Sequence, residues 1–367
     1  GPHPPPFQQE GEPMSKVLVF CIDALCASDV ARMRRMPHFA QILERGALVE
    51  KIEPVLPALT YTCHTSILTG TYAGRHGIVH NEKMTRGGHL DAPWYCMKSD
   101  VRGKTLLDIA RENGLTTCSL SWPVSGGADY TMNMPMIVPY SYQGYQPQQW
   151  LEHTATANLM DRYFYKHGRY LMGPTRSLDL FTMALALDIL EDGPQPDIML
   201  IKLCDLDSAR HTYGVESEQA ETQLRMHDEQ LGAILECLRR RGTLDETNII
   251  VLGDHGQTDI RDAFLMNVYF RQLGLLSVDA EGQITSFDAV CHSTGLAALI
   301  EVRDPDDAAL MARVREVLEA LRHDPDVQLS MVLDAAEAQK AIDILTAQGE
   351  RASVIGRVTD SGKVVIR

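Results

Sequence analysis

The sequence lacks any apolar segment of membrane-spanning length. None of its 367 residues lies in an apolar run approaching the roughly 20 residues that a transmembrane helix needs. Residues 1–13 are polar and proline-rich, without the apolar core of a secretory signal. We therefore expect no membrane span, a natural start at Met14, and a cloning remnant or disordered tail over residues 1–13.

Closely spaced cysteine pairs are also missing. The eight cysteines are scattered, no CxxC pair occurs, and several lie in apolar runs. This pattern favours buried free thiols over a disulfide framework. It predicts a cytoplasmic protein.

The chain is poor in positive charge. The chain has 34 lysines and arginines and 49 aspartates and glutamates, which gives a net charge of −15. A surface that coats nucleic acid would be basic, so that class of partner is excluded. A small anionic substrate is still allowed, because bound divalent cations can reverse the sign of a site.

Apolar runs of strand length alternate with helix-like segments along most of the chain. Strands are predicted at 17–22, 116–121, 198–204, 249–252, 297–302 and 364–366. Helices are predicted at 37–44, 105–112, 178–190, 218–241 and 306–321. The alternation predicts an α/β fold with a mostly parallel central sheet and helices on both faces.

One segment has a different texture. Residues 124–175 are rich in Met, Tyr, Gln and Pro and show weak periodicity. We interpret this segment as a small insertion or cap near the mouth of the site. The predicted organisation is one catalytic domain over residues 14–367, with a less regular C-terminal part over 260–367.

Acidic side chains stand at the carboxyl ends of the predicted strands. They are Asp23, Asp254 and either Asp205 or Asp207. Ligands of open α/β sheets bind at that edge. A single aspartate there would more often be a helix cap or loop residue, but several together favour a cation site.

Two of these aspartates have a histidine nearby. Asp207 and His211 are four residues apart, so on a helical turn both could reach one metal. Asp254 and His255 are adjacent, and Gly256 would allow a turn that directs both inward. Carboxylate oxygen with imidazole nitrogen suits zinc.

Thr60 is the candidate nucleophile. It stands at the predicted start of a helix, where backbone N–H groups favour an alkoxide and a bound phosphate. A threonine hydroxyl needs a base or a metal to become reactive. Judged locally, Thr60 would merely cap the helix; the acidic and histidine residues elsewhere favour the catalytic role.

These motifs resemble those of the alkaline phosphatase superfamily, in particular its nucleotide pyrophosphatase/phosphodiesterase branch. The resemblance extends over residues 16–259. The matching motifs, in order, are Asp23 after its strand, Pro57-x-x-Thr60 with His64 and Thr69-Gly70, His76-Gly77-Ile78 with Asn81, Trp122-Pro123, Asp207-x-x-x-His211 and Asp254-His255-Gly256.

The resemblance implies two divalent metal ions, with zinc as the expected metal. It assigns Asp23, Thr60, Asp254 and His255 to one ion and Asp207 and His211 to the other. Thr60 would attack phosphorus and form a phospho-threonine, which water then releases.

The resemblance also implies substrate contacts. Asn81 matches an asparagine that contacts a phosphate oxygen, and Tyr61 matches an aromatic residue that stacks on a base. A nucleotide substrate is therefore expected. His64 and His76 are interpreted as structural, and Asp228 as a supporting or surface residue rather than a ligand.

The match is incomplete beyond the Asp254-His255 motif. The family takes a third protein ligand of the second metal from a late His-Gly turn, and the sequence has no such turn. Two alternatives stay open: His292 substitutes, or the ligand lies beyond the end of this chain. His323 is expected on the surface.

The leading hypothesis is a metal-dependent hydrolase of phosphate diesters or nucleotide pyrophosphates. Alternatives are a phosphomonoesterase or phosphonate hydrolase of the same superfamily, or a degenerate phosphate-binding module if the second metal site is incomplete. A sulfatase is disfavoured because Cys63-His-Thr-Ser-Ile67 lacks the C/S-x-P-x-R motif. The stretch between Thr60 and Asp207 is too short for the inserted domain of a phosphoglycerate mutase.

Overall fold

The computed structural model describes most of the chain. The described residues are 15–83, 85–87, 93–136, 147–174, 176–260, 263–295, 297–325 and 327, with two short strands at 357–358 and 364–365. The tail expected at residues 1–13 lies outside this part. Among the described residues, no helix combines the length and the apolar character needed to cross a membrane.

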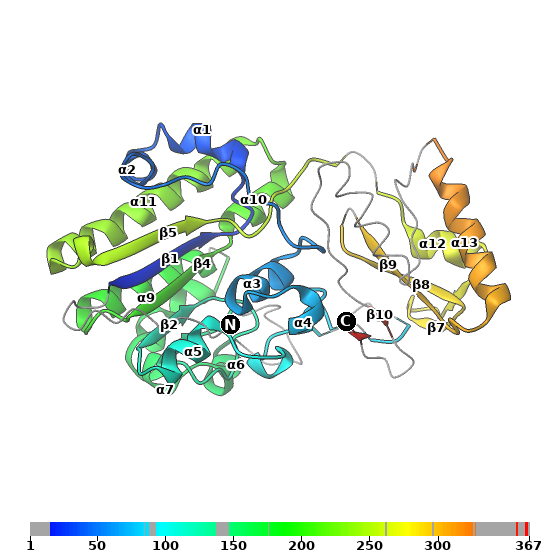
Figure 1. The fold of residues 1–367 in the computed structure, drawn as a ribbon, viewed down its shortest axis with the longest axis horizontal. Coiled ribbons are helices and arrows are strands. Elements are labelled where there is room, and N and C mark those ends of the chain that lie inside the picture. Colours follow the sequence, from blue (N-terminus) through cyan, green and yellow to red (C-terminus); the bar gives the residue numbers. More distant parts are fainter. Residues whose placement is uncertain are drawn as a thin grey trace, which may run out of the picture.

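A five-stranded sheet forms the centre of the larger part of the molecule (Figure 1). Its strands are β1 (Lys16–Ile22), β2 (Thr117–Leu120), β3 (Met132–Met134), β4 (Ile198–Leu203) and β5 (Thr247–Leu252). Their order is β3-β2-β4-β1-β5, and every neighbouring pair is parallel. The predicted α/β fold with a mostly parallel sheet is confirmed.

Helices connect the strands and cover the sheet. The longer ones are α2 (Pro37–Arg45), α3 (Thr60–Thr69), α5 (Leu106–Glu112), α9 (Leu178–Asp192), α10 (Asp205–Tyr213) and α11 (Glu218–Arg241). Shorter turns are η1 (Ala27–Asp29), α1 (Val30–Met33), α4 (Ala73–His76), η2 (Lys98–Asp100) and η6 (Leu244–Glu246).

The alternating side chains of β1 show that both faces of the sheet are buried. Leu18, Phe20 and Ile22 belong to the main core, which also holds residues of α2, α9 and α11. Val19 and Cys21 point the other way, into a second core with residues of α3 and α5. Successive residues of a strand face opposite sides, so an uninterrupted apolar run is what a doubly covered strand requires.

The predicted and observed bounds of α11 agree because local signals mark both ends. The Ser217 side chain caps the first turn by accepting a hydrogen bond from the Ala220 N–H. Gly242 ends the helix with a φ of 71°, a left-handed conformation that favours glycine. Between these ends, Leu231 and Leu235 are buried against the sheet.

The segment interpreted as an insertion is built into the core of the domain. Its described parts form β3, α6 (Pro147–Thr154), α7 (Ala157–Leu159), the π-helical turn η4 (Met160–Phe164), α8 (Tyr165–His167) and η5 (Gly168–Leu171). Leu151, Leu159, Tyr163 and Phe164 join the main hydrophobic core. The segment therefore lies beside the sheet and also contributes side chains that stabilise its core.

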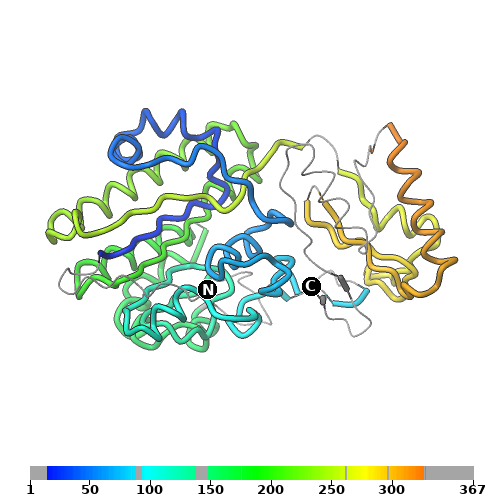
Figure 2. Tube along the Cα trace, viewed as in Figure 1, coloured from blue at the N-terminus to red at the C-terminus, as the bar shows by residue number. Residues whose placement is uncertain are grey.

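The C-terminal part forms a second, smaller group of elements beside the sheet domain (Figures 1 and 2). It consists of α12 (Met266–Gln272), β6 (Leu276–Val278), β7 (Ile284–Phe287), β8 (Ala289–Ser293), β9 (Ala298–Val302) and α13 (Ala308–Arg322), and β10 (Arg357–Val358) pairs with β11 (Val364–Val365). The β6–β7 and β8–β9 pairs are antiparallel and share a hydrophobic core with both helices. The segment after α4 reaches this group, since His80 Nε2 lies 2.8 Å from the Ser293 carbonyl oxygen.

Candidate active site

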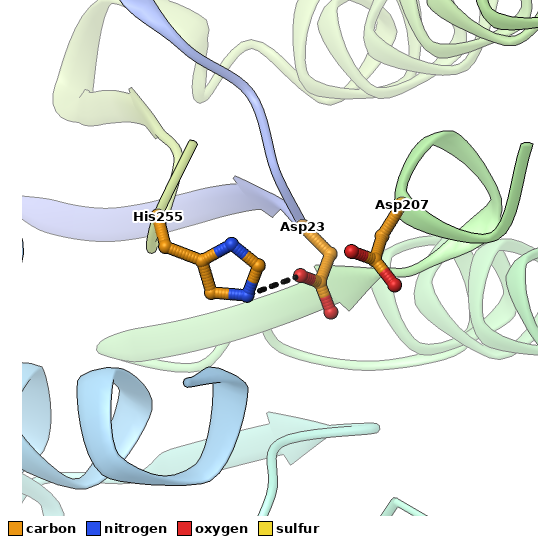
Figure 3. A group of neighbouring side chains, drawn as sticks. All are labelled: Asp23, Asp207 and His255. Atoms are coloured by element: carbon orange, nitrogen blue, oxygen red, sulfur yellow. Dashed lines mark ion pairs between the residues drawn. The ribbon is translucent and has the colours of Figure 1, made fainter. Parts of the chain in front are cut away.

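Three neighbouring strands bring the predicted site residues to one edge of the sheet. Asp23 follows β1, Asp254 and His255 follow β5, and α10 begins after β4 and carries Asp207. Because β1 lies between β4 and β5 and all three are parallel, their carboxyl ends meet there. Figure 3 shows Asp23, Asp207 and His255 grouped at this edge.

Four of the predicted ligand atoms converge on one point. His255 Nε2 lies 3.1 Å from Thr60 Oγ1, and 3.4 Å from both Asp23 Oδ1 and Asp254 Oδ2. Both carboxylate oxygens are buried, and Asp23 Oδ1 accepts no hydrogen bond among the described residues. Buried polar atoms are almost always satisfied, so an unsatisfied oxygen beside a histidine nitrogen fits a cation ligand set.

A second ligand pair adjoins the first. Asp207 Oδ1 lies 3.4 Å from His211 Nε2, and the His211 side chain is largely exposed. One ligand atom each from Asp23, Asp207 and His255 lies within 4.8 Å of the others. Asp207 thus contacts His211 and also lies near Asp23 and His255, whereas His211 is not part of that group of three.

The electrostatics of Asp23 also favour a cation. Burial raises the pKa of the Asp23 carboxyl and the nearby Asp254 carboxylate raises it further, whereas the Lys202 ammonium opposes this shift. A bound dication would favour the charged form of both groups. The chemistry of this set, which is carboxylate, imidazole and hydroxyl, fits a divalent metal.

Thr60 is the first residue of α3, and its hydroxyl points into the site. Leu59 occupies the cap position and makes no side-chain capping bond. The Thr60 hydroxyl instead faces His255 Nε2. The local alternative of a helix cap is therefore not what the structure shows.

The turn that directs Asp254 inward depends on a glycine that we did not expect. A Cβ at Gly253 would lie 1.9 Å from the Leu25 carbonyl oxygen, so only glycine fits there. A Cβ at Gly256 would meet Cys26 Cβ at an ordinary 3.5 Å. The turn therefore requires glycine at position 253, and not at position 256 as predicted. Asp254 Oδ1 is then held by the Ala24 N–H at 3.1 Å.

Two buried histidines support α3. His64 Nδ1 lies 2.7 Å from the Thr60 carbonyl oxygen and 3.2 Å from Asp254 Oδ2, and burial lowers its pKa. His76 Nε2 contacts Ser66 Oγ at 2.8 Å, and its Nδ1 accepts from the Ile78 N–H at 3.1 Å. His64 thus joins α3, which carries the predicted nucleophile Thr60, to a predicted metal ligand, and its spacing in the sequence did not reveal this link.

The two expected substrate contacts differ. Asn81 Oδ1 accepts the Tyr61 N–H at 3.0 Å, so its amide nitrogen is the atom left to donate. The Tyr61 side chain is only 1% exposed and packs edge-on against Trp94, with ring centroids 5.3 Å apart. A ring enclosed in this way offers no face to a base, so the predicted stacking role of Tyr61 is not supported.

The remaining candidates do not complete the second ligand set. His292 Nε2 lies 3.0 Å from Glu301 Oε2, on the antiparallel pair β8–β9, and does not join the metal-capable group found among the described residues. His323 is exposed at the end of α13, as expected. Asp228 is buried and accepts hydrogen bonds from the His38 and Phe39 N–H groups, which makes it a support of α2.

Two polar residues near the site were not predicted from the sequence. Lys202 is fully buried near the end of β4, and its Nζ lies 2.7 Å from Asp23 Oδ2. Gln257 Nε2 donates to Asp207 Oδ1 at 2.6 Å. A lysine within an otherwise apolar strand was the available signal for the first; nothing in the sequence indicated the second.

Comparison with known proteins identifies related chains. The family model described as type I phosphodiesterase / nucleotide pyrophosphatase matches residues 17–362. Ectonucleotide pyrophosphatase/phosphodiesterase family member 3 of Bos taurus is 24% identical over 252 residues, which cover 67% of this chain and 25% of that protein. Family member 7 of Rattus norvegicus is 23% identical over 236 residues, covering 61% and 46%. Venom phosphodiesterase of Naja atra is 25% identical over 262 residues, covering 68% and 27%.

The matched regions span between a quarter and just under half of these relatives' lengths. Among solved structures, an inactive variant of murine ectonucleotide pyrophosphatase/phosphodiesterase 5 in complex with AMP matches with a TM-score of 0.51 and 17% identity. That match covers 82% of this chain and 69% of the other. It shows a shared fold.

Proposed function

The chain belongs to the type I phosphodiesterase / nucleotide pyrophosphatase family, and from this we propose that it hydrolyses phosphate diesters or nucleotide pyrophosphates. The observation that carries the proposal is the convergence of Thr60 Oγ1, Asp23 Oδ1 and Asp254 Oδ2 on His255 Nε2. A hydroxyl among buried carboxylates and an imidazole is the arrangement that a metal-activated alcohol requires.

We propose that the site holds two divalent metal ions, preferably zinc. Asp23, Thr60, Asp254 and His255 would hold one ion, and Asp207 with His211 the other. When bound, the ions would lower the pKa of a coordinated hydroxyl and stabilise the negative charge of the reacting phosphoryl group. The oxygen and nitrogen donors of the site match zinc's preferences.

The reaction that we propose begins at Thr60. Its Oγ1 forms a bond to phosphorus while the bond from phosphorus to the leaving oxygen breaks, which gives a phospho-threonine. Water then cleaves that ester and regenerates the hydroxyl. Asn81 supports this step, because its Oδ1 is occupied by the Tyr61 N–H and its amide nitrogen can donate to a phosphate oxygen.

A diester preference is supported by how the nearby cations are used. An enzyme that prefers a monoester usually presents a cation to the extra negative charge. Arg210, from the motif that carries Asp207 and His211, donates instead to Asp29 Oδ1 at 2.6 Å, and Lys202 is paired with Asp23. A nucleotide substrate is supported by the relatives' names and by the AMP complex of the matching structure.

A paired assay tests the proposal. Wild type, Thr60→Ala and Thr60→Ser would be reconstituted with zinc and given bis(p-nitrophenyl) phosphate or p-nitrophenyl phosphate. We expect diester cleavage to exceed monoester cleavage, to disappear in Thr60→Ala and to persist in part in Thr60→Ser, which keeps a hydroxyl. Unchanged turnover in Thr60→Ala would remove the covalent step, and a monoester preference would favour the phosphomonoesterase alternative.

The incomplete second ligand set gives one further candidate. Among the described residues, the metal-capable group of Asp23, Asp207 and His255 includes neither His211 nor His292, so the fold could instead act as a phosphate-binding module. Metal analysis separates the two functions: a catalyst should hold about two zinc ions per chain, whereas a binding module should hold one or none.

We also propose a cytoplasmic location. The support is that all eight cysteines are free thiols and that five of them are buried. Free thiols persist in a reducing compartment. Fractionation of the source cells would test this, with recovery outside the cell as the contrary result.

A further inference from the structure

Lys202 occupies an unusual position for a lysine. It lies on β4, where it pairs in register with Cys21 of β1, and its side chain is fully buried. Its neighbours Ile201 and Leu203 point into the main core, so Lys202 faces the opposite side of the sheet, towards α3. Lysine is almost never fully buried unless it is paired, so its partner is informative.

That partner is the predicted metal ligand Asp23, whose two oxygens have different contacts. Oδ2 lies 2.7 Å from Lys202 Nζ. Oδ1 accepts no hydrogen bond and faces His255 Nε2 at 3.4 Å. Among the described residues, Lys202 Nζ also donates to the weak acceptor Met136 Sδ at 3.6 Å, so Asp23 is its main partner.

Resting on the metal-dependent function proposed above, we propose that Lys202 is an internal counter-ion of the metal centre. It neutralises Asp23 in the metal-free protein, limits Asp23 to one metal-binding oxygen, and lowers the affinity of the site for its first dication. In this role Lys202 is a positioning residue that acts through Asp23.

The first part of the proposal follows from the charges buried at this edge. Asp23 is 2% and Asp254 6% exposed, and both carboxylates lie beside His255. An unpaired buried charge is strongly destabilising, and Lys202 supplies the countercharge.

The second part follows from the geometry of Asp23. With Oδ2 held by Lys202, only Oδ1 is available to a cation. Four-coordinate zinc is satisfied by one oxygen per carboxylate, whereas calcium collects six to eight oxygens and often takes both from one carboxylate. Lys202 therefore favours zinc over calcium at this position.

The third part is a consequence of placing a fixed positive charge beside a dication. Like charges a few ångströms apart repel strongly in a buried site. Lys202 should therefore stabilise the metal-free protein more than the metal-loaded protein. By thermodynamic linkage, the same difference must weaken metal binding.

The experiment compares wild type with Lys202→Met and with the control Lys16→Met. Lys16 is the first residue of β1, and its Nζ lies 2.6 Å from Asp197 Oδ1. This ion pair is therefore at the end of β1 opposite to Asp23. Melting temperatures would be measured at pH 8 with chelator and with excess zinc, and zinc dissociation constants by calorimetry. Asp254→Asn reports whether zinc binds at the proposed site.

For Lys202→Met we expect a melting temperature roughly 10 °C below wild type without metal. With zinc this gap should shrink to less than half, and zinc should bind at least tenfold more tightly, by about the repulsion removed. Lys16→Met should lose the same small amount in both states and keep the wild-type zinc affinity.

Equal losses with and without zinc, together with an unchanged zinc affinity, would overturn the inference and make Lys202 an ordinary core ion pair. If Asp254→Asn binds zinc as tightly as wild type does, zinc is not bound at the proposed site, and the inference fails with that site. If Lys202→Met is unfolded without metal, zinc should fold it, as followed by circular dichroism. A variant that stays unfolded at any zinc concentration would contradict the proposal.

Discussion

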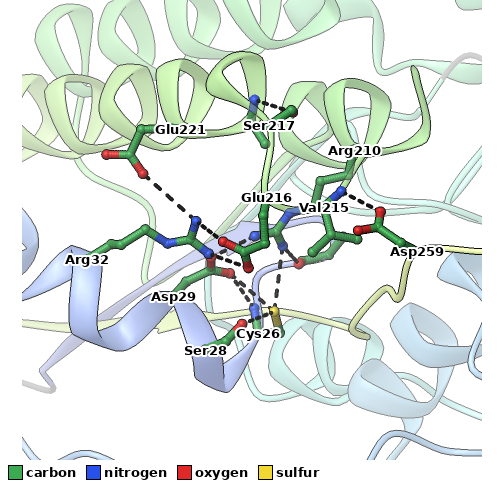
Figure 4. Close-up of polar contacts among 12 residues, drawn as sticks. Cys26, Ser28, Asp29, Arg32, Arg210, Val215, Glu216, Ser217, Glu221 and Asp259 are labelled. Carbon is green, nitrogen blue, oxygen red and sulfur yellow. Dashed lines mark hydrogen bonds and ion pairs between the residues drawn. The ribbon is translucent and has the colours of Figure 1, made fainter. Parts of the chain in front are cut away.

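Arg210 and Asp29 form a buried ion pair, in which Arg210 Nη2 donates to Asp29 Oδ1 at 2.6 Å (Figure 4). Arg210 Nη1 also donates to the Ala24 carbonyl oxygen. The pair therefore ties α10, which carries Asp207, to the loop that begins at Asp23. It couples the positions of the two predicted ligand sets, although none of its atoms is a metal ligand.

We predict that Asp29→Asn will destabilise the protein by about 3–5 kcal/mol, because it leaves the Arg210 guanidinium buried without its anion. Zinc affinity should fall as well, since α10 and the Asp23 loop lose their connection. Urea denaturation and calorimetry provide the measurements. The exposed pair Lys104–Glu112 is the control; Glu112→Gln should change stability by no more than about 1 kcal/mol.

Gly253→Ala and Gly256→Ala form a matched pair that tests the turn behind Asp254. A Cβ at Gly253 would overlap the Leu25 carbonyl oxygen, so the backbone must move. We expect a stability loss of about 1–3 kcal/mol and a fall in kcat/KM of roughly a hundredfold, since a small misplacement of a catalytic group is costly. Gly256→Ala should stay within about 0.5 kcal/mol of wild type. Equal effects of the two changes would contradict this explanation.

His76 should make the protein acid-sensitive. Burial lowers the pKa of His76 to about 4 in the folded protein, compared with an ordinary value of 6.5. Between these values the unfolded chain binds the extra proton, so the stability contributed by neutral His76 is complete above pH 6.5 and is lost as the pH falls towards 4.

In free-energy terms, His76 should lower the stability by about 2 kcal/mol between pH 8 and pH 5. Urea denaturation at both pH values would measure this. In His76→Gln, which cannot take up the proton, the difference between the two pH values should be smaller than in wild type by that amount. An identical pH dependence in the two proteins would refute the assignment.

Asp228 should stabilise α2 without taking part in the reaction. Its Oδ1 accepts the His38 N–H at 3.0 Å and the Phe39 N–H at 2.6 Å, which caps the first turn from another helix. Asp228→Ala should therefore cost about 1–2 kcal/mol, and Asp228→Asn, which keeps an accepting oxygen, less. Zinc content and kcat/KM should equal wild type in both; a loss of bound zinc would place Asp228 in the metal site instead.

Much of the fold could be predicted from the sequence. The apolar run before Asp23 predicts a strand buried on both faces, and the bounds of α11 follow from its periodicity and from Gly242. The candidate ligands were recognisable too, because strand-end aspartates and short Asp–His spacings depend on residues that are near one another in sequence. Such features reflect local backbone preferences and periodic burial.

Other features needed the folded molecule. Lys202 and Asp23 are separated by about half the length of the chain, Gly253 is constrained by Leu25, and the Tyr61 ring packs against Trp94. Each of these depends on which distant segments pack together and at what register. Sequence spacing carries no information about such contacts. The cost of burying a charge or a ring, and the space available for a side chain, are set by neighbours that come together only on folding.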